Sequence, residues 1–342
     1  MPDGSRRTKP KILVLNNENP GWPSVDLIWA HEMLETLLSG LREQGYSYES
    51  FAYFDDLSGL EHYEPHEWLI WNWGEELAGK PWTEADVAAE LERRGFAYTG
   101  STPDVFRLLQ NRAEVKRRLE AAGLPTLPSR VLLDASEARE WKLYPAIVKG
   151  VNQHASYGID RESIVTNAAE LAQRIKFIRT DFADDALVEP FLDSREFHVA
   201  VWGNDQPEAL PPMELDYSIF SDMRDRLYTY EWKFDRSSVG FRDMKMPCPA
   251  PADRPDWQAR LMAVAIAAYR ALGLRDYGRM DMRMLGDEPQ ILDVNANPDL
   301  DVTSVLPISS HAVGCSYGAM LDRIIGYAAG RMPARSSARQ TT

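Results

Sequence analysis

The sequence predicts a fold of the α/β class, with α+β parts, divided over more than one domain. A chain of 342 residues is longer than one ordinary domain of about 150 residues. In the first hundred residues, apolar runs of strand length alternate with segments of helical periodicity, which favours a parallel sheet covered by helices. Further along, β-rich segments end in two alternating strands joined by a tight turn, which is typical of a hairpin.

The first domain begins with a strand and a helix. Residues 11–15 form an apolar run, and leucines and an alanine recur at helical spacing over 27–41. Two short aromatic-rich strands are expected over 48–54 and 68–73. A helix follows over 83–94, before a glycine that ends it. This alternation indicates a parallel sheet.

A helix expected over 105–122 marks a domain boundary near 105–112, because it ends at Gly123-Leu124-Pro125 and new β-rich segments follow. These strands are predicted over 130–133, 146–149, 186–191 and 196–203. The last elements are a helix over 257–272, strands over 277–285 and 290–297, and a helix over 309–329. The tail after Arg331 has the composition of a disordered segment.

Charge and cysteine content exclude several classes of protein. The chain carries 52 acidic and 38 basic side chains, a net charge of −14, which argues against nucleic acid or an anionic membrane as a partner. Cys248 and Cys315 are too few for a disulfide framework or a structural zinc site, which indicates a reducing compartment. No run approaches the ~20 apolar residues of a membrane span, and no export signal is recognised, so we expect a cytoplasmic protein.

The predicted hairpin brings oxygen ligands together. Methionines alternate with charged residues over 279–284, which predicts a half-buried strand. If the turn is centred between residues 287 and 288, Asp281 lies opposite Val294 and beside Asp293 and Asn295. Two carboxylates and an amide suit Mg²⁺ shared with substrate phosphates. The alternative is a solvated charged face.

Two further segments suit a nucleotide. Lys149 ends a buried strand and is followed by a polar loop over 150–158, an arrangement that favours phosphate. Residues 187–196 pass from one strand through a proline-containing link into another, where backbone groups can hydrogen-bond adenine and Glu196 can accept from ribose. The alternative is two core strands with exposed carboxylates.

Taken in order, these pieces resemble the ATP-grasp superfamily, and most closely its D-alanine–D-alanine ligase branch. The segments that carry the resemblance are 98–101, 122–125, 147–158, 188–196, 228–233, 278–281 and 292–298. The resemblance implies an ATP-grasp fold with an N-terminal pre-ATP-grasp α/β domain over 1–105. It also implies three further parts, which are a small central subdomain over 106–192, a larger C-terminal subdomain over 193–330 and a disordered tail over 331–342.

The resemblance also implies roles for individual residues. The ATP phosphates would be bound by Lys149, Lys233, Arg112 and Ser156. The adenosine would be bound by the hinge residues Glu189 and Leu192, by Glu196 at the ribose, and by Ile147, Phe191 and Leu292 around the base. Two Mg²⁺ or Mn²⁺ ions would be held by Asp281, Asp293 and Asn295. Arg279 would stabilise the oxyanion, and Lys233 would be catalytic through its contact with phosphate. The substrate side would comprise Asp26, Asp299, Ser304 and Val305.

The implied activity is ATP-dependent joining of a small carboxylate substrate to an amine through an acyl phosphate. Two alternatives remain open at this point: D-alanine–D-alanine ligase itself, and a nucleotide-binding protein that has lost catalysis. A ligase for hydroxy acids or for an acceptor other than an amino acid also fits. For the oligomeric state, a homodimer is one option.

Departures from the branch fall mainly around the substrates. Arg112 replaces the first phosphate lysine, Ala155 the loop serine, Phe234 a tyrosine and Asp299 an oxyanion-site glycine. The N-terminal glycine-rich signature is absent, and Trp71, Trp73 and Trp82 near Glu75 and Glu76 are alternative pocket residues. We therefore expect substrates other than two D-alanines, with an acceptor that carries an extra amine or lacks the α-carboxylate.

Other site types are disfavoured. The segment 154–158 lacks one residue of a nucleophile elbow, and no convincing helix follows it. His62 and His66 flank a proline that breaks the helix needed to align two metal ligands. Neither a dinucleotide-binding glycine motif nor a P-loop occurs.

Overall fold

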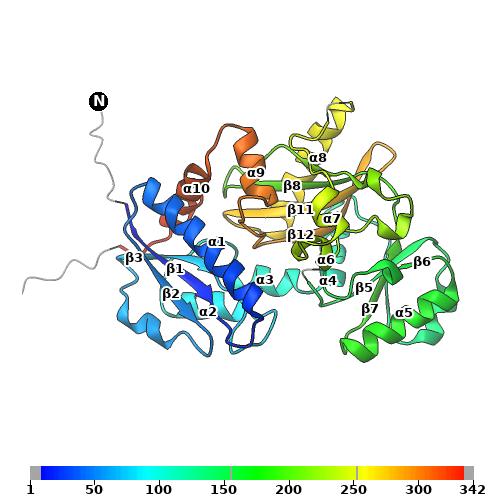
Figure 1. Ribbon diagram of the computed structural model, residues 1–342, viewed down its shortest axis with the longest axis horizontal. Coiled ribbons are helices and arrows are strands. Elements are labelled where there is room, and N and C mark those ends of the chain that lie inside the picture. Colours follow the sequence, from blue (N-terminus) through cyan, green and yellow to red (C-terminus); the bar gives the residue numbers. More distant parts are fainter. Residues whose placement is uncertain (1–8, 155, 252, 335–342) are drawn as a thin grey trace, which may run out of the picture.

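The computed structural model describes residues 9–154, 156–251 and 253–334. In this part of the chain the strands form three sheets, and helices pack around these sheets, as Figure 1 shows. The strands of the N-terminal sheet are parallel, and those of the other two sheets are antiparallel. The predicted α/β class with α+β parts is therefore confirmed.

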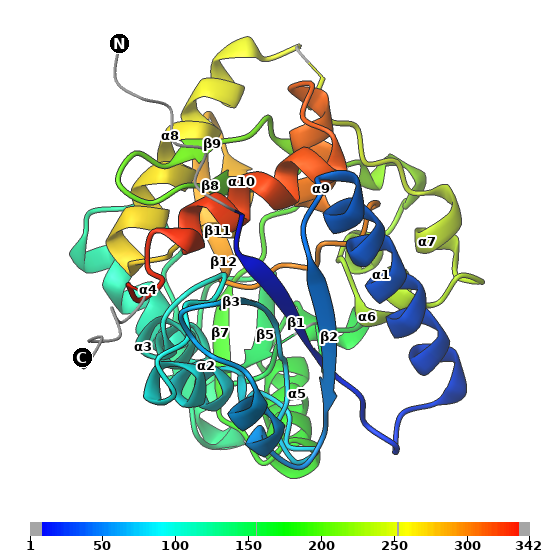
Figure 2. The same cartoon turned by 90° about the vertical axis from the view of Figure 1, so that its left-hand side faces the viewer.

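The N-terminal sheet has the strand order β2-β1-β3. Its elements are β1 (Lys11–Asn17), α1 (Ser24–Glu43), β2 (Tyr48–Tyr53), β3 (Trp68–Trp73), α2 (Glu84–Arg93) and α3 (Pro103–Leu109). Residues 12–15 of β1 are fully buried, as expected for a central parallel strand. Helix α10 (Tyr317–Ala329), from the far end of the chain, packs against α1 (Figure 2). The N-terminal sheet is thus covered partly by C-terminal residues.

A small sheet has the order β4-β7-β5-β6. Its elements are α4 (Arg112–Ala121), β4 (Arg130–Leu132), β5 (Ala146–Gly150), β6 (Ile164–Val165), α5 (Ala168–Asp181) and β7 (Ala186–Pro190). Helix α5 buries apolar residues against this sheet, including Ile175 in the cluster that holds Val148 and Val188. Lys149 lies near the end of β5, so the phosphate loop leaves this sheet as predicted.

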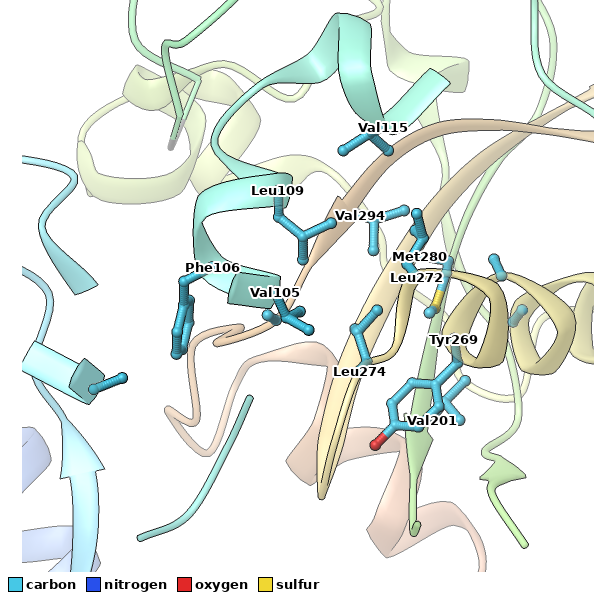
Figure 3. Close-up of a cluster of buried hydrophobic side chains, with 14 of the residues drawn as sticks. Val105, Phe106, Leu109, Val115, Val201, Tyr269, Leu272, Leu274, Met280 and Val294 are labelled. Atoms are coloured by element: carbon cyan, nitrogen blue, oxygen red, sulfur yellow. The ribbon is translucent and has the colours of Figure 1, made fainter. Parts of the chain in front are cut away.

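The third sheet has the order β10-β8-β11-β12, with β9 paired to β8. Its strands are β8 (Glu196–Trp202), β9 (Glu208–Ala209), β10 (Met213–Leu215), β11 (Tyr277–Leu285) and β12 (Glu288–Asn295). The helices of this part are α6 (Tyr230–Phe234), α7 (Val239–Asp243), α8 (Pro255–Leu272), α9 (Val305–Ala312) and α10. Figure 3 shows Val105 and Leu109 of α3 in the same core as Leu274 and Val294. This shared core joins α3 to the third sheet.

Two of the helices predicted from the sequence are each divided into two helices in the structure. The expected helix over 105–122 is broken between α3 and α4, where Asn111 is extended and its side chain accepts a hydrogen bond from the Glu114 amide. Such an N-cap starts a new helix. The expected helix over 309–329 is likewise broken between α9 and α10 near Gly314, which has φ +79°. A positive φ ends a helix, and glycine adopts it without steric cost.

The hairpin turn lies one residue earlier than predicted. Leu285 pairs with Glu288, so the turn comprises Gly286 and Asp287. Gly286 adopts φ +61°, and two-residue hairpin turns of the primed types require a positive φ at this position. The prediction placed the centre of the turn after Asp287, because the sequence offers several polar residues in a row.

A β-bulge at Leu292 then changes the register again. Asp281 lies opposite Asp293, and the predicted pairing of Asp281 with Val294 is wrong. The bulge has a packing reason, because Ile291 and Val294 are three residues apart and yet both enter the same core. Regular alternation would have turned one of them to the other face.

The disordered tail was predicted to begin too early. Arg331 is half-buried beside the third sheet, where its Nη2 lies 2.5 Å from Asp276 and 2.6 Å from the carbonyl of Tyr98. Residues 335–342 lie outside the described part of the chain. Each sheet falls within one predicted domain range, but the boundaries themselves stay a prediction. In the described residues, no helix is long and apolar enough to cross a bilayer.

Candidate active site

The face of the β11–β12 hairpin opposite the methionine core is charged. Asp281 and Asp293 are directly opposite each other, as are Arg279 and Asn295. Arg279 binds Asp281 with its fork: Nε donates to Oδ1 at 2.7 Å and Nη2 donates to Oδ2 at 2.9 Å. Burial alone would lower the pKa of Arg279, but the Asp281 carboxylate raises it, so the guanidinium stays charged.

The hairpin residues fit a divalent cation that is shared with phosphate. Two carboxylates and an amide are hard oxygen donors, and Mg²⁺ typically takes one or two carboxylates and completes its octahedron with phosphates and water. Oδ1 of Asn295 accepts a hydrogen bond from the amide of Asn297 at 2.9 Å, which orients that side chain. In the described part of the chain, no group of three or more His, Cys, Asp or Glu is placed to hold a metal. Two carboxylates and one amide leave coordination positions for phosphate oxygens, so these donors suit a cation bound jointly with a nucleotide.

Arg112 joins the hairpin to the phosphate loop. Its Nη2 lies 3.3 Å from Oδ2 of Asp293, and Nη1 donates to the carbonyls of Gly150, at 2.8 Å, and Gln153. Burial alone would raise the pKa of Asp293, but Arg112 and Lys149 hold it well below its usual value. The planar fork thus reaches two elements at once, which a lysine ammonium would do less specifically.

Lys149 is held by a fully buried carboxylate. Oε1 of Glu189 lies 2.9 Å from Nζ of Lys149, and Oε2 lies 2.8 Å from Nζ of Lys116. Burial raises the pKa of Glu189, but the two ammonium groups outweigh this and lower it. The side chain of Glu189 therefore orients Lys149, and the assignment of this hinge residue to adenine stays a prediction. Lys116 was not singled out, although its place one helical turn after Arg112 was a usable signal.

Lys233 lies on α6 and contacts the phosphate loop. Its Nζ donates to Oγ of Ser156 at 2.7 Å, and that hydroxyl donates to the carbonyl of Tyr228 at 2.8 Å. Burial and the charge of Arg279 lower the pKa of Lys233 to about 8. Ser156 has φ +64°, a conformation that non-glycine residues rarely adopt. The two loops that the sequence assigned to phosphate therefore meet.

Two of the three residues assigned to the adenine base lie together beside the small sheet. Ile147 and Phe191 belong to one buried cluster, together with Leu227 and Ile164. Leu292 lies at the bulge, where it lines a small cavity between α4 and β12. The residues predicted around the base thus come from the small sheet, the hinge and β12.

The carboxylate assigned to the ribose has fixed partners. Glu196 is almost fully buried, and it contacts Arg283 at 2.8 Å, Tyr217 at 3.2 Å and His198 at 3.2 Å. Burial alone would raise the pKa of Glu196, but Arg283 and His198 lower it to about 2, so the group is ionised. Sequence reasoning missed His198 and placed Arg283 only on a charged face.

The residues assigned to substrate lie on separate elements. Ser304 precedes α9 and donates to the carbonyl of Asp299 at 2.6 Å, and Val305 is the first residue of that helix. Asp26 lies in the first turn of α1. Burial raises the pKa of Tyr230 on α6, and the charges of Tyr157 and Asp26 add to this rise. Ala155 and the side chain of Phe234 lie outside the described residues.

Of the tryptophans proposed for a substrate pocket, one is excluded. Trp71 is fully buried in the core cluster that α10 shares with the N-terminal sheet, so it cannot line a pocket. Trp73 packs against the edge of that core. Trp82 instead lies against His154 of the phosphate loop, with ring centroids 5.2 Å apart. The sequence could not separate these roles, because aromatic residues serve both cores and pockets.

Two other carboxylates, those of Glu84 and Asp299, act on the side chain of Glu75. Glu75 is exposed, yet desolvation by the surrounding atoms and the charges of Glu84, Asp299 and Glu76 raise its pKa to about 7. Desolvation raises the pKa of Glu84 and of Asp299 as well, although Arg279 partly offsets the rise at Asp299. The N-terminal domain thus brings acidic groups close to the loop that follows β12.

Comparison with known proteins gives consistent matches. A family model described as D-ala D-ala ligase C-terminus matches residues 120–326. The chain is 30% identical to a D-alanine–D-alanine ligase of Desulfovibrio desulfuricans, over 84% of this chain and 89% of the relative. For a D-alanine–D-alanine ligase of Marinomonas the identity is 31%, over 83% and 86%. An uncharacterised protein of Sinorhizobium fredii is 28% identical over 92% and 93%.

Solved structures agree with this match. A D-alanine–D-alanine ligase from Bacillus anthracis superposes with a TM-score of 0.70, covering 94% of this chain and 98% of its own, at 20% identity. The same ligase complexed with ATP gives a TM-score of 0.70 at 19% identity. At 20% and 19% sequence identity, these two structural matches show a shared fold.

Proposed function

The chain belongs to the D-alanine–D-alanine ligase family of the ATP-grasp superfamily, and on this premise we propose that it joins a small carboxylate substrate to an amine other than D-alanine. Its ATP-grasp fold is shared with the solved ligases. Like its relatives, it is an ATP-dependent carboxylate–amine ligase that forms a C–N bond and uses a divalent metal. Membership of the family does not specify the two substrates, and their chemical class is the part that we propose.

One observation supports the phosphate site most strongly: Arg112 contacts both the phosphate loop and Asp293. Arg112, Lys149 and Lys233 come from α4, β5 and α6, and each lies by the loop that follows β5 or by the hairpin. Such a group of cations suits a triphosphate, in a chain whose net charge of −14 repels anions elsewhere. Asp281, Asp293 and Asn295 would hold two Mg²⁺ ions, which neutralise phosphate charge when bound.

The proposed reaction uses these positions. A substrate carboxylate oxygen attacks the γ-phosphorus of ATP, the bond to the β-phosphate oxygen breaks, and an acyl phosphate and ADP result. The amine then attacks the acyl carbon, a proton leaves the nitrogen, and inorganic phosphate departs. Arg279, oriented by Asp281, stabilises the tetrahedral oxyanion. Removing one such donor typically lowers the rate by a factor of ~10² to 10³.

The acidic groups support the choice of amine. The charges of Glu84 and Asp299 both act on Glu75, and the charge of Arg279 acts on Asp299. Carboxylates at this place attract an ammonium group and repel a free α-carboxylate. An acceptor with a second amine, or one without an α-carboxylate, therefore fits better than D-alanine. Because the reaction uses ATP and the two cysteines are unpaired, a cytoplasmic location is part of the same proposal.

A substrate screen tests the proposal. Purified protein, ATP and Mg²⁺ are incubated with pairs of amino acids and small amines, ADP release is measured, and products are identified by mass spectrometry. We expect a diamine or decarboxylated amine to give the highest efficiency. D-alanyl-D-alanine formed more efficiently than every other product would contradict the substrate proposal. ATP binding without ADP release for any pair would favour the inactive nucleotide-binding protein.

A further inference from the structure

Arg283 connects three parts of the candidate nucleotide site. It is 2% exposed and lies directly opposite Glu196 across β11 and β8. Its Nε donates to Oε2 of Glu196 at 2.8 Å, Nη1 donates to the carbonyl of Leu192 at 2.5 Å, and Nη2 donates to the carbonyl of Arg226 at 2.5 Å. One guanidinium therefore holds the hinge, the carboxylate assigned to ribose and the segment that leads to α6.

The hinge is also held from its other side. The side chain of Arg226 donates to both oxygens of Asp193, at 2.8 and 2.9 Å. The carbonyl of Arg226 accepts from Arg283, so these two arginines together hold residues 192–193. In addition, the guanidinium of Arg283 lies 4.8 Å from the ring centroid of Phe191, a residue assigned to the base. A cation over an aromatic face attracts the ring and favours this arrangement.

The third contact of Arg283 reaches toward the phosphate side. The segment 226–233 begins at the carbonyl that Arg283 holds and ends at Lys233. It contains Leu227, which belongs to the buried cluster around Phe191. It also contains Tyr228, whose carbonyl accepts from Ser156. A short segment of the chain therefore connects the contact of Arg283 with the lysine that contacts the phosphate loop.

We propose that Arg283 is a positioning residue for ATP, which holds Glu196 ready for the ribose hydroxyls and the segment 226–233 ready for the phosphates. The inference rests on the proposed function, because it requires ATP to occupy this hinge. Both oxygens of Glu196 have partners, and those partners are buried. The carboxylate is therefore preorganised, which lowers the cost of ordering it when a ligand binds.

The test compares ATP with 2′-deoxy-ATP. Calorimetry with Mg²⁺ measures the affinity of both nucleotides for the wild type, for Arg283→Met and for Arg283→Lys. We expect the wild type to prefer ATP by about tenfold or more, as the loss of a hydrogen bond to a charged group implies. Arg283→Met should lower ATP affinity about tenfold and reduce the preference to less than about twofold, because Glu196 loses the guanidinium that pairs with its charge and keeps only Tyr217 and His198. Arg283→Lys keeps one donor and should be intermediate.

A matched control separates positioning from general damage. Arg195 neighbours Glu196 in sequence and forms a two-point pair with Glu214, both contacts at 2.6 Å. Arg195→Met should lower thermal stability and leave the preference for ATP unchanged. A wild-type preference in Arg283→Met would overturn the inference, as would a wild type that binds both nucleotides equally. If Arg283→Met does not fold, unchanged preference in Arg283→Lys overturns it too. A wild type that binds neither nucleotide contradicts the proposed function itself.

Discussion

Lys233 donates a 2.7 Å hydrogen bond to the hydroxyl of Ser156, although 77 residues separate them in the chain. The same hydroxyl donates to the carbonyl of Tyr228 at 2.8 Å, so one serine joins the phosphate loop to the segment that leads into α6. The ammonium group thereby lies beside the loop that the sequence assigned to phosphate. This contact is the basis of the first prediction.

Lys233→Met should lower turnover far more than Ser156→Ala. The methionine removes the cation, whereas the alanine keeps the cation and removes the hydroxyl that contacts Lys233 and Tyr228. We expect a loss of ~10²-fold or more in kcat for Lys233→Met, and a change of a few-fold in the KM for ATP for Ser156→Ala. Steady-state ADP release measures both. Equal effects of the two substitutions would show that Lys233 acts only through Ser156.

Lys149→Ala should weaken the binding of Mg²⁺-ATP by about tenfold or more, because phosphate charge is left uncompensated beside a buried strand. Calorimetry measures the affinity. Lys116→Met is the matched control, since Lys116 pairs with the other oxygen of the same carboxylate, Glu189. Lys116→Met should lower the stability of the protein and leave most of its affinity for Mg²⁺-ATP. Unchanged affinity in Lys149→Ala would remove this residue from the phosphate site.

Asp293→Ala and Asn295→Ala should lower turnover and raise the Mg²⁺ concentration needed for half-maximal rate, while the fold stays intact. Both side chains supply oxygen donors on one face of the hairpin. Asp287→Ala, at the turn of the same hairpin, is the control and should leave the Mg²⁺ dependence unchanged. If both variants keep wild-type rates at limiting Mg²⁺, the hairpin is only a charged surface.

Glu75→Gln should change how stability depends on pH. The folded state raises the pKa of Glu75 from 4.5 to about 7, through desolvation and neighbouring carboxylates. Between these values the folded state binds more protons than the unfolded state, so this group makes stability fall as pH rises. In Glu75→Gln, the thermal stability should therefore fall less between about pH 4.5 and pH 8 than it does in the wild type. Thermal unfolding scans over this pH range measure the difference. Glu120→Gln, at an exposed position, should keep the wild-type fall, and an identical profile in both variants would contradict the raised pKa.

Arg331→Met should destabilise the protein by about 3 kcal/mol, because it leaves the buried Asp276 carboxylate without the guanidinium that pairs with it. Asp276 also accepts from the Gly100 amide, so the pair joins the N-terminal domain to the start of β11. Urea denaturation measures the loss. Arg260→Met removes an exposed pair with Glu288 and should cost less than about 1 kcal/mol. Similar losses in the two variants would contradict the structural role of Arg331.

The sequence by itself determined the fold class, the succession of the main strands along the chain and the charged face of the hairpin. Periodicity and turn residues are local, so they identified the parallel N-terminal strands and the strand over 277–285 with its actual bounds. The resemblance to a ligase family rested on motifs in a shared order, and the family matches confirm it. The individual site residues stay predictions.

Tertiary structure decided which of these side chains meet. The bulge at Leu292 depends on how Ile291 and Val294 fill a shared core, which no local pattern shows. The pairs of Glu189 with Lys116 and of Glu196 with Arg283 join residues far apart in the chain, and burial selects them because a charge inside the protein needs a partner. The local sequence determines where each strand lies in the chain and which of its faces is polar. Packing and the free-energy cost of burying a charge determine which residues the strand contacts.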